Sequence, residues 1–358
     1  MKIHNFSAGP SILPKEVFQE ASQAVIDYHN TGLSLLEMSH RSKEFDAVLN
    51  EALELVAELL HLPENYKSIF ISGGASTQFA LVPMNLLSSD EKAAYINTGT
   101  WSDKAIKEAK ALGNVEVIAS SKEDNYTHIP KNYQVPEDAS YLHITTNNTV
   151  FGTQFRKIPA TSVPIVADMS SDIFSYDLDV DKFGLIYAGA QKNMGPAGTT
   201  LVIVREELLG KADRHIPSMF DYRTHIKKNS AFNTPPVFPI YVSMLNLRWV
   251  KKTGGVKAME ERSIRRSDLI YGEIDRNPLF RGTTAKEDRS RMNATFVLNE
   301  DYESLENDFL EVCKSAGISG IKGHRSVGGF RASMYNALSL ESVQVLVDVM
   351  RDFENRKG

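Results

Sequence analysis

The chain has 358 residues, an ordinary globular composition and a formal net charge of −5, so it can bury a large core and form more than one domain. The net charge argues against a nucleic-acid partner. The single cysteine, Cys313, excludes an internal disulfide and a cysteine-rich metal site, and we expect no metal. Because neither a signal peptide nor a long apolar run is visible, we expect a cytoplasmic protein without a membrane partner.

The first 60 residues predict an extended arm followed by two helices. Residues 5–14 are rich in turn formers, and an amphipathic helix is expected from residue 15 to about residue 28. A polar loop that contains His40 and Arg41 precedes the second helix, at 45–60. On their own, these two side chains are interpreted as solvated loop residues.

Residues 67–207 alternate between strand patterns and helix patterns. This alternation indicates a mostly parallel sheet with crossover helices. The last strand follows its predecessor closely, and we expect it to pair antiparallel at an edge of the sheet. Strands are predicted at 68–71, 93–96, 115–118, 141–144, 164–167, 185–188 and 199–204, and helices at 76–87 and 102–112.

The C-terminal part predicts a second, smaller layer. Residues 213–239 look like a loop, and the pattern changes near Asn277-Pro278, beyond helices at 240–252 and 256–276. We expect an α/β fold with a large domain at 15–262 and a small C-terminal domain at 263–358, near which the arm at 1–14 packs. The later elements are predicted as strands at 294–298, 318–322 and 330–335 and helices at 302–315 and 340–355.

A single lysine, Lys192, follows the apolar strand at 185–188 among small residues. Ligands of open α/β sheets bind just beyond the carboxyl ends of the strands. A desolvated lysine amine in that place can form a Schiff base with a carbonyl compound. The alternative is a solvated loop lysine that merely follows a strand.

An acid, Asp168, ends the preceding apolar run and lies 24 residues before Lys192 (192 − 168 = 24). One crossover fits between them, so both residues can stand at the same edge of the sheet. Pyridoxal phosphate needs such a pair, because the lysine carries its aldehyde and a carboxylate keeps its ring nitrogen protonated. The alternative for Asp168 is an N-cap of the next element.

Three further stretches suit a flat, anionic cofactor and an anionic substrate. The Gly-Gly turn at 72–77 joins a strand to a helix start and suits a phosphate. Trp101 follows the next strand and can stack on a ring. Residues 322–333 hold His324, Arg325 and Arg331 around a second Gly-Gly turn, and arginine binds carboxylate or phosphate with two parallel hydrogen bonds.

Together these stretches resemble the phosphoserine aminotransferases, which are class-V pyridoxal-phosphate enzymes of fold type I. The family's fold implies a large domain with a mainly parallel seven-stranded sheet and a smaller C-terminal α/β domain. The likeness covers nearly the whole chain, and the stretch around His324-Arg325 is its most specific part. The matching stretches are residues 5–10, 39–42, 73–76, 97–101, 167–171, 189–193, 233–236 and 323–333.

The resemblance implies catalytic roles for Lys192 as the Schiff-base lysine, Asp168 as the partner of the ring nitrogen and Trp101 as the stacking residue. These three also belong to a larger set that would bind the cofactor. The remaining members of that set are Ala75, Ser76 and Gln191 at the phosphate, Thr149 near the ring hydroxyl, and Asn233 and Thr234 reaching the phosphate of the neighbouring subunit.

For the substrate, the resemblance implies that Arg331 binds the α-carboxylate. The distal phosphate or carboxylate would be bound by His40, Arg41, His324 and Arg325. Many family members carry Gly-Arg where this chain has Ala75-Ser76, so contacts to the distal anion must come from elsewhere. The family assembles as a homodimer with shared active sites, and we expect the 233–236 loop and the His324-Arg325 pair to face the partner's site.

The implied reaction moves an amino group from glutamate to 3-phosphohydroxypyruvate, giving phosphoserine and 2-oxoglutarate. The family is also linked to a phosphorylated hydroxythreonine in vitamin B6 synthesis. One alternative is another fold-type-I reaction, such as that of an alanine–glyoxylate aminotransferase or a cysteine desulfurase. The other is a non-catalytic binding protein with the same fold.

Overall fold

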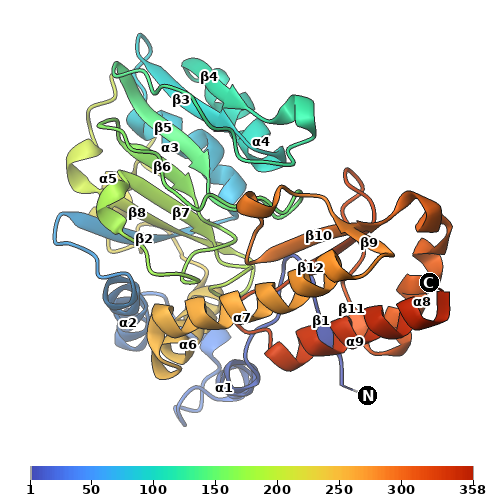
Figure 1. Cartoon of the computed structure of the whole chain (residues 1–358). Helices are drawn as coiled ribbons and strands as arrows, with labels where there is room; N and C mark the ends of the chain where they lie inside the picture. The colour runs from blue at the N-terminus through green and yellow to red at the C-terminus, as the bar shows by residue number, and fades with distance from the viewer. Residues whose placement is uncertain (1, 358) are drawn as a thin grey trace.

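The structure is a computed structural model that describes residues 2–357. Its centre is a seven-stranded sheet with the strand order β2-β8-β7-β6-β5-β3-β4 (Figure 1). The pairs from β4 through β3, β5 and β6 to β7 are all parallel. The strands are β2 (Tyr66–Ser72), β3 (Lys92–Asn97), β4 (Asn114–Ser120), β5 (Ala139–Thr145), β6 (Ile165–Asp168), β7 (Leu185–Gly189) and β8 (Thr199–Arg205).

The predicted mainly parallel sheet is confirmed, but the predicted place of its last strand is wrong. β8 pairs antiparallel as expected, yet it lies between β2 and β7 and leaves β2 at the edge. All but the last residue of β8 are buried. Its run of apolar residues, without polar alternation, is typical of a strand covered on both faces and flanked on both sides.

Two sets of helices cover the two faces of this sheet. Alternate residues of each strand face opposite sides, and the two resulting clusters of buried side chains contact different helices. One face packs against α1 (Lys15–Ile26), α2 (Lys43–Leu59) and α6 (Val237–Lys252), and the other against α3 (Gln78–Leu86), α4 (Thr100–Lys110) and α5 (Tyr222–Lys227).

The helix α5 corrects the prediction of a continuous loop at 213–239. The side chain of Asp221 caps this short helix by accepting a hydrogen bond from the N–H of Arg223 at 2.9 Å. Tyr222 is fully buried and donates its hydroxyl hydrogen to Oε1 of Gln78 at 2.6 Å. Six residues are too few to show a helical period in the sequence, and tertiary packing holds the segment.

The C-terminal part adds a second layer around its own core of six phenylalanines and aliphatic side chains. Here β10 pairs antiparallel with both β9 and β12, whereas β11 pairs in parallel with β1 of the arm. The predicted strand at 318–322 is thus only two residues long, and β9 was not predicted. The elements are β1 (His4–Asn5), α7 (Gly255–Arg276), β9 (Phe280–Gly282), β10 (Asn293–Leu298), α8 (Glu306–Ser315), β11 (Ile318–Ser319), β12 (Phe330–Ser333) and α9 (Leu340–Lys357).

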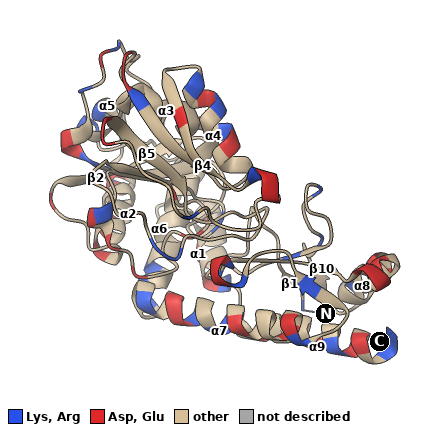
Figure 2. Ribbon diagram, turned by 45° about the horizontal axis from the view of Figure 1, so that its top comes forward, with Lys and Arg blue, Asp and Glu red and all other residues tan. Residues whose placement is uncertain are grey.

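The long helix α7 runs beneath both layers and lies beside α9 (Figure 1). It is continuous across residues 262 and 263, where the sequence analysis divides the domains. Acidic and basic residues alternate along the exposed faces of both helices (Figure 2). The buried carboxylate of Glu273 joins them, because it accepts hydrogen bonds from Arg276 at 2.6 Å and Arg351 at 2.9 Å.

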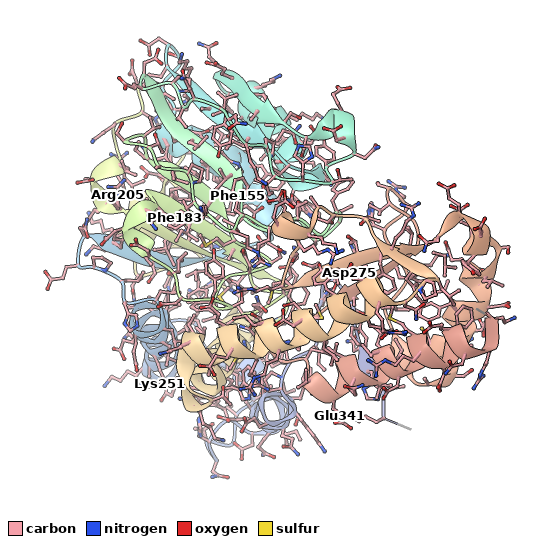
Figure 3. All side chains as sticks on the ribbon, viewed as in Figure 1. Phe155, Phe183, Arg205, Lys251, Asp275 and Glu341 are labelled. Atoms are coloured by element: carbon pink, nitrogen blue, oxygen red, sulfur yellow. The ribbon has the colours of Figure 1, made fainter. Side chains whose placement is uncertain are left out.

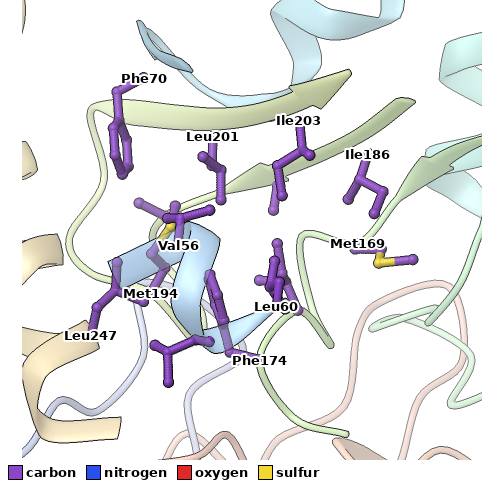
Figure 4. Close-up of a cluster of buried hydrophobic side chains, with 14 of the residues drawn as sticks. Val56, Leu60, Phe70, Met169, Phe174, Ile186, Met194, Leu201, Ile203 and Leu247 are labelled. Atoms are coloured by element: carbon purple, nitrogen blue, oxygen red, sulfur yellow. The ribbon is translucent and has the colours of Figure 1, made fainter. Parts of the chain in front are cut away.

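The larger core lies between the sheet and the helices α2 and α6. Phe155 and Phe183 lie inside the part of the molecule that the seven-stranded sheet and its helices form, whereas Lys251 lies at the periphery of this part (Figure 3). Ile186 and Ile203 of the sheet project towards the helices that carry Val56 and Leu247, and the packed side chains form one cluster (Figure 4). Among residues 2–357 no helix has the length and apolar character that crossing a membrane requires.

Candidate active site

A cavity of about 340 Å³ lies where the parallel strands end, at the border of the two layers. Residues from the arm, from the ends of five strands (β2, β3, β5, β6 and β7) and from the C-terminal layer line it. Nine of the predicted site residues meet there, although they are spread over most of the sequence. They are Ala75, Ser76, Trp101, Thr149, Asp168, Gln191, Lys192, His324 and Arg331.

The other five predicted site residues do not line this cavity in their own chain: His40, Arg41, Asn233, Thr234 and Arg325. Arg41, Thr234 and Arg325 are exposed, and the remaining two are partly exposed. His324 lines the cavity of its own chain, whereas its neighbour Arg325 does not. The expectation that this pair faces the partner's site stays a prediction. Both residues belong to the turn at 323–329, which brings only His324 to the cavity.

Lys192 follows the end of β7 and is 9 % exposed. The arm holds the backbone around it, because the N–H of Ser11 donates to the carbonyl of Gln191 at 3.0 Å and the Ser11 hydroxyl donates to the carbonyl of Lys192. Burial lowers the pKa of Lys192 to about 8, with Asp168 acting to raise this pKa and Arg331 to lower it. Part of the amine is therefore neutral, and nucleophilic, near neutral pH.

Asp168 is the last residue of β6 and is 6 % exposed. Its Oδ1 accepts hydrogen bonds from the Ser170 N–H at 2.9 Å and the Ser170 hydroxyl at 2.6 Å. Burial raises the pKa of Asp168, while hydrogen bonds from Ser170 and Tyr187 and the charge of Lys192 act in the opposite direction. The carboxylate form is therefore supported by specific neighbours against the cost of burial.

Trp101 stands in the first turn of α4, directly after β3, and its indole forms one side of the cavity. The indole N–H donates to Oγ1 of Thr149 at 3.0 Å, which fixes the orientation of the ring. Nζ of Lys192 lies 5.7 Å from the indole centroid, and Nζ of Lys104 lies 4.7 Å from it. A flat aromatic surface is thus presented beside the buried amine.

The Gly-Gly turn brings backbone N–H groups to the cavity at the start of α3. Gly73 has a φ of +103°, a left-handed conformation that favours glycine. Its N–H donates to Gly198 at 3.0 Å and its carbonyl accepts from the hydroxyl of Thr200 at 3.0 Å, so the turn is fixed to β8. Ala75 and Ser76 then begin the helical segment, whose free N–H groups suit an anion.

Arg331 reaches the cavity from β12, and its Nη1 donates to the carbonyl of Thr149 at 3.0 Å. Its Nε is buried without a partner among residues 2–357, so the guanidinium has donors left for a ligand. Burial lowers the pKa of His324, and the neighbouring charges of Arg331, Arg325 and Lys104 lower it further. This end of the cavity is therefore strongly positive.

Lys104 and Ser170 are among the lining residues of the cavity that were not predicted from the sequence. Lys104 lines the cavity, and its position three residues after Trp101 on a helix could have indicated this, since such residues share a face. Ser170 both lines the cavity and donates two hydrogen bonds to Asp168. The Asp-x-Ser spacing, which lets a side chain bond the backbone two residues on, was the available signal.

Comparisons with known proteins identify the class to which this fold and site belong. Residues 3–346 match the family model described as aminotransferase class-V. A phosphoserine aminotransferase of Flavobacterium psychrophilum is 61% identical over 358 residues, covering 99% of this chain and 100% of the relative. That of Bacteroides thetaiotaomicron is 58% identical and covers 99% of both chains.

Solved structures agree with these relatives. The phosphoserine aminotransferase of Bacillus circulans subsp. alkalophilus superposes with a TM-score of 0.96 at 46% identity, covering 100% of this chain and 99% of the other. The enzyme of Trichomonas vaginalis, solved with bound PLP, gives a TM-score of 0.93 at 36% identity, covering 98% and 100%. The chain therefore belongs to the class-V aminotransferases and, within them, to the phosphoserine aminotransferase family.

An alanine–glyoxylate aminotransferase of Nostoc shares the fold with a TM-score of 0.75, but only 15% of its residues are identical over 98% of this chain and 95% of that one. The fold is thus common to several aminotransferases. Membership of the narrower family depends on the identity of the residues.

Proposed function

We propose that this protein transfers an amino group from L-glutamate to 3-phosphohydroxypyruvate, producing O-phospho-L-serine and 2-oxoglutarate, with pyridoxal phosphate as cofactor. The observation that carries the proposal is a single cavity that joins a buried lysine and carboxylate to a strongly positive end. At that end, Arg331, Lys104 and His324 face a common space. A substrate with an α-carboxylate and a distal phosphate has two anionic groups to place there.

The residues present fit pyridoxal phosphate. Lys192 offers an amine whose pKa is lowered, Asp168 a buried carboxylate, and Trp101 a flat indole with a fixed orientation. Backbone N–H groups at Ala75 and Ser76 suit the phosphate. The bound cofactor supplies an aldehyde that accepts amino groups and a ring that stabilises negative charge on the substrate's α-carbon.

Lys192 and Asp168 carry out complementary tasks in this proposal. Nζ of Lys192 would take the proton from the substrate's α-carbon as general base and, as general acid, deliver it to C4′ of the cofactor, for which a pKa of about 8 is suitable. Asp168, held as a carboxylate by Ser170, keeps the ring nitrogen protonated.

Arg331 and Trp101 position the reactants. The guanidinium of Arg331 binds the substrate's α-carboxylate through two parallel hydrogen bonds, for which its unpartnered Nε is available. Trp101, whose indole is oriented by its hydrogen bond to Thr149, would stack on the cofactor ring, and Thr149 would serve the ring hydroxyl. Gln191, between β7 and Lys192, adds a contact to the cofactor phosphate.

The five predicted residues outside the cavity lead us to propose a homodimer with shared sites. Asn233 and Thr234 reach the cofactor phosphate of the partner, and His40, Arg41 and Arg325 complete the region that binds the distal phosphate. Exposed apolar side chains support a subunit interface near these loops, because Met219, Phe220 and Phe232 remain 37–41% exposed in the single chain. A two-fold axis makes such sharing reciprocal.

The remaining parts of the proposal concern organisation and location. A large domain at 15–262 and a small domain at 263–358 share the continuous helix α7, and the arm connects to the small domain through β1 and β11. The protein works in the cytoplasm.

The proposal is tested with purified holoenzyme. Glutamate should change the visible absorbance of the bound cofactor with release of 2-oxoglutarate, and 3-phosphohydroxypyruvate should restore the spectrum with formation of phosphoserine. The Lys192→Ala variant is the control, because it should bind the cofactor yet lose turnover by about 10²–10⁴-fold. A holoenzyme whose spectrum does not respond to glutamate, or a variant with normal turnover, would refute the proposal.

A further inference from the structure

The N-terminal arm forms part of the cavity wall directly beside Lys192. Ala8 and Gly9 line the cavity, and Gly9 has a φ of +144°, a conformation that favours glycine. A β-carbon at Gly9 would lie 3.5 Å from Cγ of Lys192, so the backbone of the arm lies against the stem of the lysine. Two residues further on, Ser11 donates hydrogen bonds to the backbone carbonyls of Gln191 and Lys192. The arm therefore contacts the reactive lysine along both its side chain and its backbone.

The other end of the arm belongs to the C-terminal layer. Phe6 is fully buried in the core of that layer, and β1 lies beside β11 (Figure 1). The N–H of Phe6 donates to the carbonyl of Ser319 at 2.8 Å, and the carbonyl of Phe6 accepts from the N–H of Ser333 at 3.3 Å. Ser333 ends β12, the strand that carries Arg331. The arm thus connects the strand of the substrate-binding arginine to the backbone of the lysine.

Between these two ends, Tyr335 holds the arm at Ala8. Tyr335 follows β12 and is 1% exposed. Its hydroxyl donates to the carbonyl of Ala8 at 2.8 Å, and its oxygen accepts from Nδ2 of Asn293 at 3.2 Å. Asn293 is itself fixed, because its Oδ1 accepts from Nδ2 of Asn147 at 2.8 Å and its Nδ2 also donates to the hydroxyl of Ser333 at 3.0 Å. The hold on the arm is therefore anchored in both layers.

The hydrogen bonds of this network run in one direction. The hydroxyl of Ser290 donates to Oδ1 of Asn147, which turns the amide NH₂ of Asn147 towards Asn293. Because an amide oxygen can only accept, Oδ1 of Asn293 faces Asn147 and its NH₂ group faces Tyr335. The single hydroxyl hydrogen of Tyr335 is then left for the carbonyl of Ala8. The side chains of Asn147, Asn293 and Tyr335 are at most 2% exposed, so water competes little for these bonds.

We propose that Tyr335 is a positioning residue that holds residues 8–11 against Lys192, so that the arm shields the stem of the lysine from water and keeps its amine directed into the cavity. Tyr335 acts through the arm, because its hydroxyl bonds the backbone of Ala8 and the next residue, Gly9, lies against the lysine. A lysine that must be partly neutral needs such a wall, since hydration favours the charged amine. The inference rests on the proposed function, in which Lys192 is the catalytic amine.

The decisive variant is Tyr335→Phe, which removes one oxygen atom and leaves the ring in the core. The carbonyl of Ala8 then loses its donor, and the arm should open more often. Hydrogen exchange of the holoenzyme, followed by mass spectrometry, measures this opening in peptides that contain the N–H of Ser11, which is bonded to Gln191 in the parent protein. We expect exchange about tenfold faster than in the parent protein, the effect of losing one buried hydrogen bond.

Two further measurements report on Lys192 itself. In apoprotein, modification of Lys192 by an amine-selective reagent should rise with pH through a midpoint at least about half a pH unit higher in the variant, because a better hydrated amine keeps its proton to higher pH. In holoenzyme, kcat for amino transfer should fall about tenfold with little change in KM. A displaced amine slows the transfer of the proton, whereas Arg331 still binds the α-carboxylate.

A matched control is Tyr66→Phe, because it also removes a buried hydroxyl that donates to a backbone carbonyl. Tyr66 is 5% exposed at the start of β2, and its hydroxyl donates to the carbonyl of Phe183 at 2.6 Å. This variant should lose similar stability, yet exchange of the arm, the midpoint at Lys192 and kcat should all stay close to those of the parent protein. Circular dichroism of both variants verifies that the fold is retained, and the Phe ring keeps the core filled in each.

The possible outcomes separate this inference from the proposed function. Unchanged exchange of the arm in Tyr335→Phe would overturn the inference, as would faster exchange with an unchanged midpoint at Lys192 or an unchanged kcat. Changes of the same size in Tyr66→Phe would assign Tyr335 a purely structural role and overturn it as well. A parent holoenzyme that does not respond to glutamate would instead refute the proposed function, while the exchange and modification measurements would still show whether Tyr335 holds the arm against Lys192.

Discussion

The backbone N–H of Asn336 donates a hydrogen bond to Oδ1 of Asn193 at 3.0 Å, which ties the loop before α9 to the residue that follows Lys192. The same loop is held from α7, because Nη1 of Arg266 donates to the carbonyls of Asn336 at 3.0 Å and Leu338 at 2.6 Å. Arg266 is 1% exposed. The placement of the reactive lysine therefore depends on contacts with the C-terminal layer.

Removing the hydrogen bond between Asn336 and Asn193 should affect both the stability of the fold and the position of Lys192. The variant Asn193→Ala leaves the buried N–H of Asn336 without its acceptor, so we expect the free energy of unfolding to fall by about 1–3 kcal/mol. Denaturant unfolding of the holoenzyme measures this loss. We also expect a lower rate of amino transfer, because the backbone that carries Lys192 loses its support.

The variant Asn85→Ala is a control for this experiment. Asn85 is buried like Asn193, and its side chain forms hydrogen bonds with the backbone of Leu81, Phe220 and Tyr222, away from the C-terminal layer. It should lose similar stability while the transfer rate of the remaining folded enzyme stays close to normal. If both variants keep the normal rate, the contact between Asn336 and Asn193 contributes to the fold alone.

The lowered pKa of Lys192 predicts how its reactivity depends on pH. Only the neutral amine is nucleophilic, and an ordinary lysine becomes neutral around pH 10.5, whereas Lys192 should do so around pH 8. In apoprotein, modification of Lys192 by an amine-selective reagent should therefore rise with pH through a midpoint near 8. Peptide mass spectrometry at a series of pH values measures this midpoint. A midpoint near 10.5 would show that the amine is not desolvated.

The same shift has a consequence for the stability of the apoprotein. Because the folded pKa is lower than the unfolded one, the unfolded chain binds more protons between about pH 8 and 10.5. The penalty for burying the charged amine, about 3 kcal/mol, is therefore present below pH 8 and fades as the pH rises through this window. A lysine stabilised by an ion pair would show the opposite dependence, because its contribution to stability is lost as the pH rises.

Two cations of the cavity should differ in their effect on different substrates. Arg331→Lys should reduce kcat/KM for phosphoserine and for alanine alike, because both have an α-carboxylate and lysine cannot reproduce the two parallel hydrogen bonds. Lys104→Met should reduce kcat/KM for phosphoserine by about tenfold and leave alanine nearly unchanged, because only phosphoserine has a distal anion. Steady-state kinetics with both amino donors measures the difference.

Lys107→Met provides the control for Lys104→Met, since Lys107 lies one turn further along α4 and does not line the cavity. It should behave like the parent enzyme with both donors. A loss of activity with alanine as large as that with phosphoserine in Lys104→Met would contradict a role in binding the distal phosphate.

The meeting of Lys192 and Asp168 at one end of the sheet was predictable because its signal is local. Asp168 ends one apolar strand and Lys192 closely follows the end of the next, and parallel strands place such residues at the same edge of the sheet. The position of β8 was not predictable, because no local pattern says which strands become neighbours. The helix at Tyr222 was missed because a segment of six residues is held by its cap and its buried tyrosine.

The contact between His143 of β5 and Tyr187 of β7 was missed for a related reason. The two residues lie 44 positions apart in the sequence, and only the strand order brings Nε2 of His143 to 2.9 Å from the hydroxyl oxygen of Tyr187. Lys104 was hidden differently, since a lysine on a charged helix normally faces solvent. Sequence patterns thus identified the groups that end strands, whereas the supporting contacts depend on tertiary packing.

Subunit exchange tests whether the sites are shared. Lys192→Ala and Arg325→Ala should each be inactive or strongly impaired as purified proteins. If Arg325 serves the partner's site, each mixed dimer has one site with both residues intact. Statistical mixing should then restore roughly a quarter of the parent activity, since about half of the dimers are mixed and each has one good site of two. Activity that stays at the sum of the two variants after proven exchange would show that Lys192 and Arg325 of one site come from the same chain.

The most direct test of the proposed function is the ratio of kcat/KM for phosphoserine to that for serine, measured with 2-oxoglutarate as acceptor. The two donors differ only in the phosphate, so the ratio isolates recognition of the distal anion. The positive end of the cavity around Arg331, Lys104 and His324 predicts a preference for phosphoserine of at least about 100-fold, because a site built for an anion leaves its charges unpaired when the anion is missing. A ratio near one would contradict the proposed substrate, even if amino transfer itself occurs.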